Sequence, residues 1–364
     1  MRWTQLHIAT YKCFWPRRLC VLLTAIALSS CIQPGFPKDA KIRLEEPAKV
    51  VALSPDSTFE GNLDQILQCL DIQIVSDTIL ILESQTSASD LYIFKAYSLD
   101  TFQYLGSIIP EGRGPGEMLS PHIAKGSPDG QYLCVNDNAV GKAYLVDVLS
   151  SIDEGNTVVC SEVELPSNTI DWAPLEENKH FCLRMSDNEF VYQINDKYGA
   201  DLKTITPYDG ISGENNVTYL SSAMAVNREK GLVALGMVCL PQLLIVRTDD
   251  ESIISTAVDK AYRNWKQIFS TAFSMDTKQY FSEIACTNEY IFASYLDCSL
   301  ESVLNGGHGT TICVFDWDGH FLQKLMIKED ISALAVSGNV DYLYCIDKID
   351  GKILRYGLKV LDTF

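Results

Sequence analysis

Hydrophobic and polar residues alternate in short runs along most of the chain, and from residue 45 onwards no long stretch has the spacing of an amphipathic helix. Alternation with a period of two is typical of β-strands that have one buried face. The runs are separated by sequences rich in aspartate and glycine, which tolerate the backbone angles of tight hairpins. Examples are SPDG (127–130), DWDG (316–319) and DKIDG (347–351). We therefore predict an all-β fold built from repeated hairpins.

One segment recurs at a distance that measures the repeating unit. Residues 132–142 (YLCVNDNAVGK) align without gaps on residues 342–352 (YLYCIDKIDGK), at an offset of 210. This offset fits four units of about 52 residues or five of about 42, and a four-stranded propeller blade has roughly 40–50 residues. The longer unit predicts a six-bladed β-propeller, and the shorter one leaves seven blades as the alternative. A weaker pair of similar segments is 102–108 and 321–327.

One blade can be drawn strand by strand. From the innermost strand outwards, its strands are HIAKGS (122–127), QYLCVND (131–137), KAYLVDV (142–148) and TVVCSEVEL (157–165). The ring also has to close, because an open ring would leave two bare sheet edges. We expect the segment AKVVAL (48–53) to pair with the last blade.

The N-terminus has the pattern of an export signal. Arg17 and Arg18 precede an apolar run of about a dozen residues, too short to be a permanent membrane span. The run ends in LSSC, and Leu28 to Cys31 resembles a bacterial lipobox, whose cysteine is lipidated after cleavage. We predict a lipoprotein signal peptide (1–30), lipidation at Cys31, a polar tether (31–44) and a propeller domain (45–364).

Charge narrows the range of partners. The formal net charge is −18, and the first thirty residues carry four basic side chains and no acidic one, which leaves the remainder near −22. So acidic a surface repels phosphate backbones, which argues against nucleic acid as a partner. Nine cysteines follow Cys31 without a C-x-x-C pair, many of them in apolar runs. We expect mostly reduced cysteines buried in the core.

Three glycines and two prolines crowd the sequence PEGRGPG (110–116). A P-loop requires a lysine and a hydroxyl residue after its last glycine, and a dinucleotide fingerprint requires another glycine spacing. We interpret the stretch as a crossover that joins the outer strand of one blade to the inner strand of the next. In a second interpretation Arg113 and Glu117 line a ligand surface near the channel. The candidate loop consists of Glu111, Gly112, Arg113, Gly114, Pro115, Gly116 and Glu117.

These segments together resemble a known family. An apolar strand running into Gly-x-Gly-Pro-Gly-Glu (104–118) is similar to a motif of the TolB-like six-bladed propeller lipoproteins of Bacteroidetes. The lipobox, the segment LDIQIVSDTILILES (70–84) and the terminal DYLYCIDKIDGKILRYGL (341–358) fit the same pattern. The resemblance implies a six-bladed propeller attached to the bacterial cell envelope by lipid, on the periplasmic or surface side of the outer membrane. It implies no particular activity.

Candidate chemistry is sparse in the sequence. The four histidines after the signal peptide are His122, His180, His308 and His320, and no two are close in sequence. We expect no metal site and no cofactor. The absence of a G-x-S-x-G motif also weakens the case for a serine hydrolase. Asp316-x-Asp318-Gly319 reads as a hairpin turn, GGHGTT (306–311) as a loop and KAYRNWKQIF (260–269) as a segment covering a blade.

The sequence thus predicts a monomeric, non-enzymatic lipoprotein whose disc binds a protein, a peptide or a glycan. The alternative is a propeller enzyme, of lyase or lactonase type, with its site at the central channel. Among the residues of the predicted inner strand at 122–127, only His122 and Lys125 could take part in such chemistry. Convergence of three or more ionisable side chains at one end of the channel would favour the enzyme.

Overall fold

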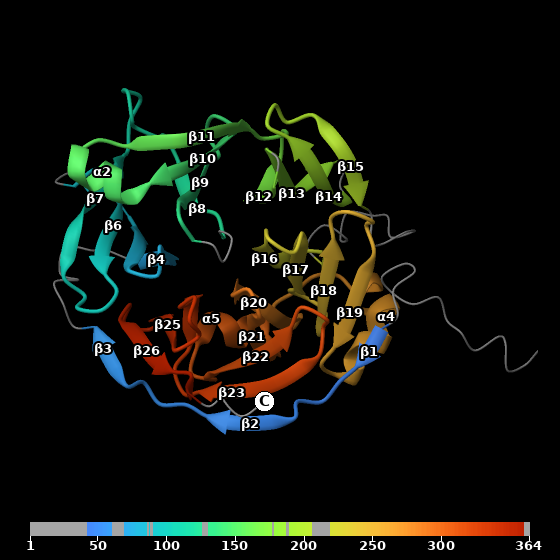
Figure 1. The fold of residues 1–364 in the computed structure, drawn as a ribbon. Coiled ribbons are helices and arrows are strands. Elements are labelled where there is room, and N and C mark those ends of the chain that lie inside the picture. Colours follow the sequence, from blue (N-terminus) through green and yellow to red (C-terminus); the bar gives the residue numbers. More distant parts are fainter. Residues whose placement is uncertain are drawn as a thin grey trace, which may run out of the picture.

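Six β-sheets form a ring around a central channel, as the computed structural model shows (Figure 1). The structure describes residues 42–359 except 60–68, 86, 88–89, 126–129, 177, 187–188 and 206–218. The predicted signal peptide, Cys31 and most of the predicted tether lie outside the described residues. The all-β, six-bladed propeller predicted from the sequence is confirmed.

Each blade is an antiparallel sheet whose strands follow one another along the chain from the channel to the rim. In chain order they are β4 (Cys69–Val75), β5 (Ile79–Ser84), β6 (Tyr92–Ser98) and β7 (Tyr104–Pro110) in blade 1; β8 (Pro121–Ile123), β9 (Leu133–Asp137), β10 (Lys142–Asp147) and β11 (Val158–Glu164) in blade 2; β12 (Thr169–Pro174), β13 (Lys179–Ser186), β14 (Glu189–Asp196) and β15 (Asp201–Ile205) in blade 3; β16 (Ser222–Asn227), β17 (Leu232–Met237), β18 (Gln242–Arg247) and β19 (Ile253–Ala257) in blade 4; β20 (Lys278–Cys286), β21 (Tyr290–Ser299), β22 (Thr310–Asp316) and β23 (Phe321–Ile327) in blade 5; and β24 (Ile331–Val336), β25 (Tyr342–Asp347) and β26 (Ile353–Gly357) in blade 6.

The N-terminal strands form a strap along the rim of three blades (Figure 1). Strand β1 (Ile42–Leu44) pairs in parallel with β19, β2 (Lys49–Ala52) pairs in parallel with β23, and β3 (Ser57–Phe59) pairs antiparallel with β26. The expectation that residues 48–53 pair with the last blade is therefore wrong, because these residues lie on blade 5. Blade 6 has only three strands from the C-terminal part of the chain, and β3 completes it because it directly precedes blade 1. Residues 42–44, expected at the end of the tether, are part of the ring.

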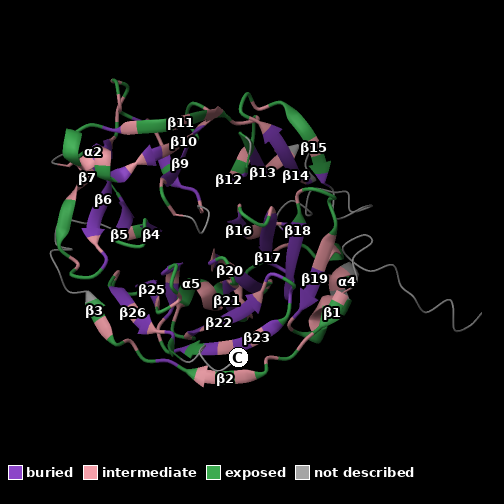
Figure 2. Ribbon diagram, in the orientation of Figure 1, coloured by how far each residue is buried: buried purple, intermediate pink, exposed green. Residues whose placement is uncertain are grey.

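The hydrophobic core is divided among the seams between blades. Six clusters of buried residues each join two neighbouring blades, so that every seam has one. The second strands β5 and β17 are buried throughout, whereas outer strands such as β11 are largely exposed (Figure 2). Burial of a large apolar side chain contributes roughly 1.5–3 kcal/mol, so the seams supply the main stabilisation of the ring.

The internal repeats mark equivalent positions in the ring. Residues 132–142 include β9 and residues 342–352 include β25, which are the second strands of blades 2 and 6. Residues 102–108 and 321–327 overlap the fourth strands of blades 1 and 5, β7 and β23. Both pairs are four blades apart, which is the separation expected for the longer repeat. The predicted blade at 121–165 is also confirmed, as blade 2.

The described chain also contains short helices outside the six sheets. They are α2 (Val148–Glu154), the 3-10 helix η2 (Lys260–Asn264), α4 (Trp265–Ser270) and α5 (Leu300–Asn305). Helix α4 packs Trp265, Ile268 and Phe269 against the seam between blades 3 and 4, as expected of a covering segment. Within the described residues, none of the helices has the length and apolarity needed to cross a membrane. All nine cysteines that follow Cys31 are described and are free thiols, five of them buried, in agreement with the sequence-based expectation.

Candidate functional site at the central channel

Four ionisable side chains from the inner parts of four blades meet in the central channel. Lys125 follows the inner strand β8 of blade 2, and its Nζ forms an ion pair with Asp71 on β4 of blade 1. The same Nζ lies 3.7 Å from Oε2 of Glu283 on β20 of blade 5. Asp171, on β12 of blade 3, also acts electrostatically on Lys125. We call Asp71, Lys125, Asp171 and Glu283 the channel cluster.

Irregularities in the inner strands bring these acids to the channel. The pairing register shifts between Cys69 and Asp71 in blade 1, and between Thr169 and Asp171 in blade 3. A β-bulge re-aims the side chains beside it. The two aspartates occupy equivalent positions, and each Oδ1 accepts a hydrogen bond from the next backbone N–H at 2.8 Å. In blade 5 a third irregularity, between Phe281 and Ile284, contains Glu283.

The cluster has more acidic groups than basic ones. Burial acts to lower the pKa of Lys125, but the negative charges of Asp71 and Glu283 outweigh it and raise that pKa, so the ammonium is charged at neutral pH. Burial raises the pKa of Asp171 to about 7, and Lys125 counteracts the rise only in part. Burial, together with the nearby aspartates, also raises the pKa of Glu283. One ammonium thus faces three carboxyl groups.

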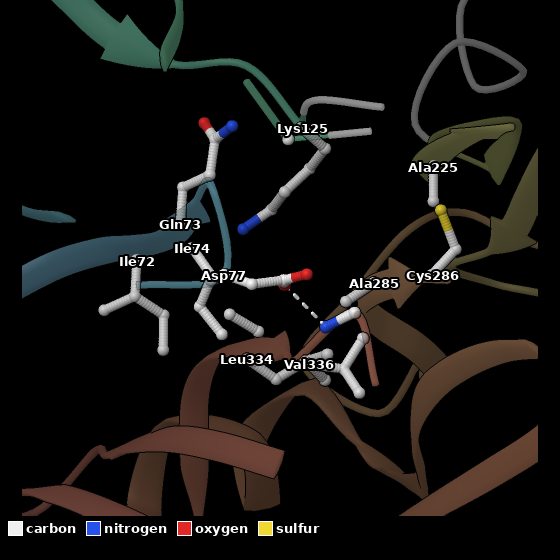
Figure 3. Close-up of a pocket in the computed structure, with 13 residues that line it drawn as sticks. Ile72, Gln73, Ile74, Asp77, Lys125, Ala225, Ala285, Cys286, Leu334 and Val336 are labelled. Atoms are coloured by element: carbon white, nitrogen blue, oxygen red, sulfur yellow. Dashed lines mark hydrogen bonds between the residues drawn. The ribbon is translucent and has the colours of Figure 1, made fainter. Parts of the chain in front are cut away.

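Lys125 borders two hollows of the channel. A cavity of about 320 Å³ is lined by all four residues of the cluster together with His122, Ser222, Ser282 and Asn136. A smaller cavity of about 70 Å³ is lined by Lys125, Gln73, Cys286 and Asp77, and Figure 3 shows the Lys125 side chain reaching into it. The side chains of Lys125 and Glu283 remain 17% and 27% exposed, so a ligand can reach them through the larger cavity.

His122 borders the larger cavity from blade 2. Its Nδ1 lies 2.9 Å from Oε1 of Glu83, whose other oxygen accepts the backbone N–H of Ile123 at 2.7 Å. The hydrogen bond with Glu83 raises the pKa of His122, which favours the cationic imidazole. The His122 side chain is 48% exposed, so it can contact a bound molecule. His122 and Lys125, the two residues singled out in the predicted inner strand, thus do lie at the channel.

The other histidines do not join this site. His308 Nδ1 lies 3.3 Å from Asp330, and His320 Nδ1 lies 3.3 Å from Glu45 on the strap. His180 is buried in the seam between blades 2 and 3, and burial lowers its pKa to about 4. Within the described part of the chain, no group of three histidine, cysteine or acidic side chains is placed to hold a metal ion.

The glycine-rich loop is the crossover between β7 of blade 1 and β8 of blade 2. Gly112 N donates to Met118 O at 2.9 Å, and the Glu117 carboxylate accepts from Gly114 N at 2.6 Å. Gly116 has a φ of +78°, and its carbonyl accepts from Thr157 Oγ1 at 2.6 Å, next to the outermost strand of blade 2. The loop thus packs against the rim, and residues 111–117 line neither channel cavity. Arg113 is exposed there, and its role in binding stays a prediction.

Sequence reasoning missed Asp71, Asp171 and Glu283. The available signal was an aspartate directly before a large apolar residue near the start of a predicted inner strand, in LDIQIV (70–75) and TIDWAP (169–174). The convergence itself could not be read from the sequence, because it depends on bulges and on blades that are far apart along the chain.

A family model and one solved structure agree with this architecture. A member of the DUF4221 family from Bacteroides vulgatus is 14% identical and superposes with a TM-score of 0.52, over 88% of this chain and 97% of that one. The β-propeller domain of Cps50 (Swd1) from Myceliophteria thermophila is 10% identical, with a TM-score of 0.47 over 84% of this chain and all of that one. The hydrazine synthase of Kuenenia stuttgartiensis is 11% identical, with a TM-score of 0.48 over 82% of this chain and 79% of that one. The sequence matches no curated protein. The family model described as TolB-like 6-blade propeller-like matches residues 47–339, and the chain therefore belongs to the TolB-like six-bladed propeller family.

Proposed function

We propose that this protein is a ligand-binding lipoprotein of the bacterial cell envelope, and that its ligand enters the larger channel cavity and contacts the channel cluster. The observation that carries the proposal is the convergence of Asp71, Lys125, Asp171 and Glu283 around a cavity of about 320 Å³. Ligand sites are commonly concave, with a few convergent polar groups and perturbed pKa values. Export and the lipid anchor at Cys31 are part of the proposal and rest on the lipobox sequence.

The partner class consists of a protein, a peptide or a glycan that presents one group to the channel. A disc with an accessible cavity of about 320 Å³ at its channel is suited to a ligand that projects a side chain or a terminal unit. The surrounding acidic surface disfavours nucleic acid.

The test is a binding screen with the full-length protein purified in detergent. Peptide and glycan arrays are probed with the wild type, with Asp171→Asn/Glu283→Gln, and with Asp276→Asn/Glu289→Gln. The last variant removes the same number of charges at two exposed positions. We expect the wild type and the surface variant to bind the same ligands, and the channel variant to lose them. Equal binding by all three proteins, or none by the wild type, would contradict the proposal.

An enzyme is the second candidate function, because four ionisable side chains line one cavity of the channel, and a convergence of three or more is the arrangement expected to favour an enzyme. Asp171, whose pKa is about 7, could exchange protons near neutral pH, as an acid or base of a lyase or lactonase must. The cationic state of Lys125 argues against a nucleophilic lysine. Turnover of a lactone or of a uronate polysaccharide that disappears in Asp171→Asn would support the enzyme. Ligand binding without turnover would favour the binding protein over the enzyme.

A further inference from the structure

We propose that the channel site recognises a cationic nitrogen group, namely a primary ammonium or a guanidinium carried on a flexible aliphatic chain. The proposal rests on the proposed function and specifies its ligand. Such a group occurs on the lysine and arginine side chains of a peptide and on free polyamines, and the experiment below separates these two sources.

The balance of charge in the cluster selects the sign of the ligand. Lys125 forms ion pairs with Asp71 and, at 3.7 Å, with Glu283, so that one ammonium is shared among the three carboxyl groups of the cluster. Where Asp171 and Glu283 are ionised, a cation placed beside them in the larger cavity gains attraction, whereas an anion there is repelled. Partial burial strengthens both effects, because the surrounding dielectric constant is lower than in water.

An unsatisfied acceptor lies at the smaller cavity, which Lys125 shares with the larger one. Gln73 is 8% exposed, and its Oε1 has no hydrogen-bond partner within the described residues. Its Nε2 donates to Tyr132 O at 3.4 Å, which leaves the oxygen as the free end of the amide. Gln73 lines the smaller cavity with Lys125, and Figure 3 shows the two side chains on the same side of β4. A buried acceptor without a donor is costly, and an ammonium or guanidinium brings several N–H donors.

The site favours an organic cation over a metal ion. No group of three suitable ligands exists among the described residues, and the Lys125 ammonium already pairs with Asp71 and Glu283. The larger cavity, of about 320 Å³, also contains the neutral polar side chains of Ser222, Ser282 and Asn136, which suit the polar backbone or linker of a ligand. Its size lies within the usual range of small-ligand pockets, roughly 300–1,000 Å³.

Proton release should accompany binding. A cation beside Asp171 stabilises its carboxylate, so that a group with a pKa of about 7 loses its proton when the ligand arrives. Affinity is therefore expected to rise between pH 6 and pH 8, and to fall with added salt.

The experiment is calorimetric titration of the full-length protein in detergent. The probes are Nα-acetyl-lysine methylamide, which presents only a side-chain ammonium, and cadaverine, a free diamine. Nα-acetyl-norleucine methylamide supplies the same chain without charge, and Nα-acetyl-glutamate methylamide supplies the opposite charge. We expect the lysine probe to bind, the norleucine and glutamate probes to fail, and the ratio of lysine probe to cadaverine to show whether peptide or polyamine fits better.

Variants test whether the channel cluster is responsible. Asp171→Asn/Glu283→Gln should weaken binding of the lysine probe at least tenfold. The surface variant Asp276→Asn/Glu289→Gln should bind this probe as the wild type does. Lys125→Met removes the internal ammonium and should tighten binding of the lysine probe. Lys125→Gln serves as a second variant, and circular dichroism checks that both variants are folded. Weaker binding of the lysine probe to a folded Lys125 variant, or binding of the glutamate probe by the wild type, would overturn the inference. If the arrays yield ligands that depend on the cluster and no cation binds, the ligand class is wrong while the proposed function stands.

Discussion

Single residues in the channel show what the sequence could and could not predict. His122 and Lys125 stand in a predicted inner strand, and alternation alone placed them near the channel. Their acidic partners Asp71 and Asp171 are aimed by β-bulges, and a bulge adds one residue without changing the hydrophobic pattern enough to be recognised. A site assembled from bulges is therefore visible only in three dimensions.

Asp171 gives a prediction for the pH dependence of stability. Its pKa is about 7 in the folded protein and close to the ordinary value of 3.8 when unfolded. The cost of its buried charge is absent below pH 4, grows between pH 4 and 7, and is complete above pH 7. We expect Asp171→Asn to leave the melting temperature unchanged at pH 4 and to raise it at pH 8, with little effect of Asp276→Asn at either pH. A lower melting temperature of Asp171→Asn at pH 8 would show that the carboxylate stabilises the fold.

The glycines of the crossover differ in what a side chain would meet. A Cβ at Gly116 would lie 2.6 Å from Asn156 Oδ1 at a φ of +78°, and one at Gly112 would lie 1.9 Å from Glu117 Oε2. At Gly114 the nearest atoms are those of the Glu117 carboxyl group, at 3.0 Å. We therefore expect Gly112 and Gly116 to tolerate a side chain less well than Gly114.

Substitutions in the crossover test this order by urea unfolding. Gly116→Ala combines backbone strain with a close contact, and we expect a loss of about 1–3 kcal/mol in the free energy of unfolding. Gly114→Ala should cost less, and Arg113→Ala should stay within about 0.5 kcal/mol, as for most exposed residues. If Gly114→Ala proves the most harmful of the three, the loop does not have the geometry described.

At the scale of elements, the order of strands within a blade was predictable and the path of the strap was not. Blade 2 follows from period-two alternation and turn residues, both of which are local signals. The strap segments carry the same local signal, but their partners β19, β23 and β26 are about two hundred residues or more away. Which blade each strap strand joins depends on how far the chain advances around the rim between strands, and alternation does not encode that distance.

Deletions in the strap give the prediction at this scale. Removing residues 41–53 deletes β1 and β2 but keeps β3, so the edges of blades 4 and 5 are exposed while blade 6 stays complete. Removing residues 41–59 also deletes β3, together with the pairing of Asp56 with Arg355, whose Nε lies 3.0 Å from Asp56 Oδ1. We expect the longer deletion to lower the melting temperature clearly more than the shorter one. Equal melting temperatures would mean that β3 is not needed to close the ring.

For the whole molecule, the repeat at a fixed offset limited the expectation to six blades, with seven as the alternative, and the structure has six. Each blade buries both faces against its neighbours, so the six seam clusters have to form together, and a ring with a different number of blades would change every seam. The ring also brings the inner strands of five blades to one cavity, although they are separated by as many as two hundred residues. The candidate site is therefore a property of ring closure rather than of any one blade.

The last prediction concerns how the disc is held in the envelope. We expect Cys31 to carry the lipid, and the segment from Cys31 to the first strap strand at Ile42 can span at most about 40 Å even when fully extended. Cys31→Ala should therefore move the protein from the membrane fraction to the soluble fraction and abolish labelling by a palmitate analogue, while its melting temperature stays that of the wild type. Cys160→Ala, which alters an exposed cysteine on the rim, should change neither fraction nor labelling. Retention of Cys31→Ala in the membrane with unchanged processing would rule out the lipid anchor and would leave the propeller and its channel site unaffected.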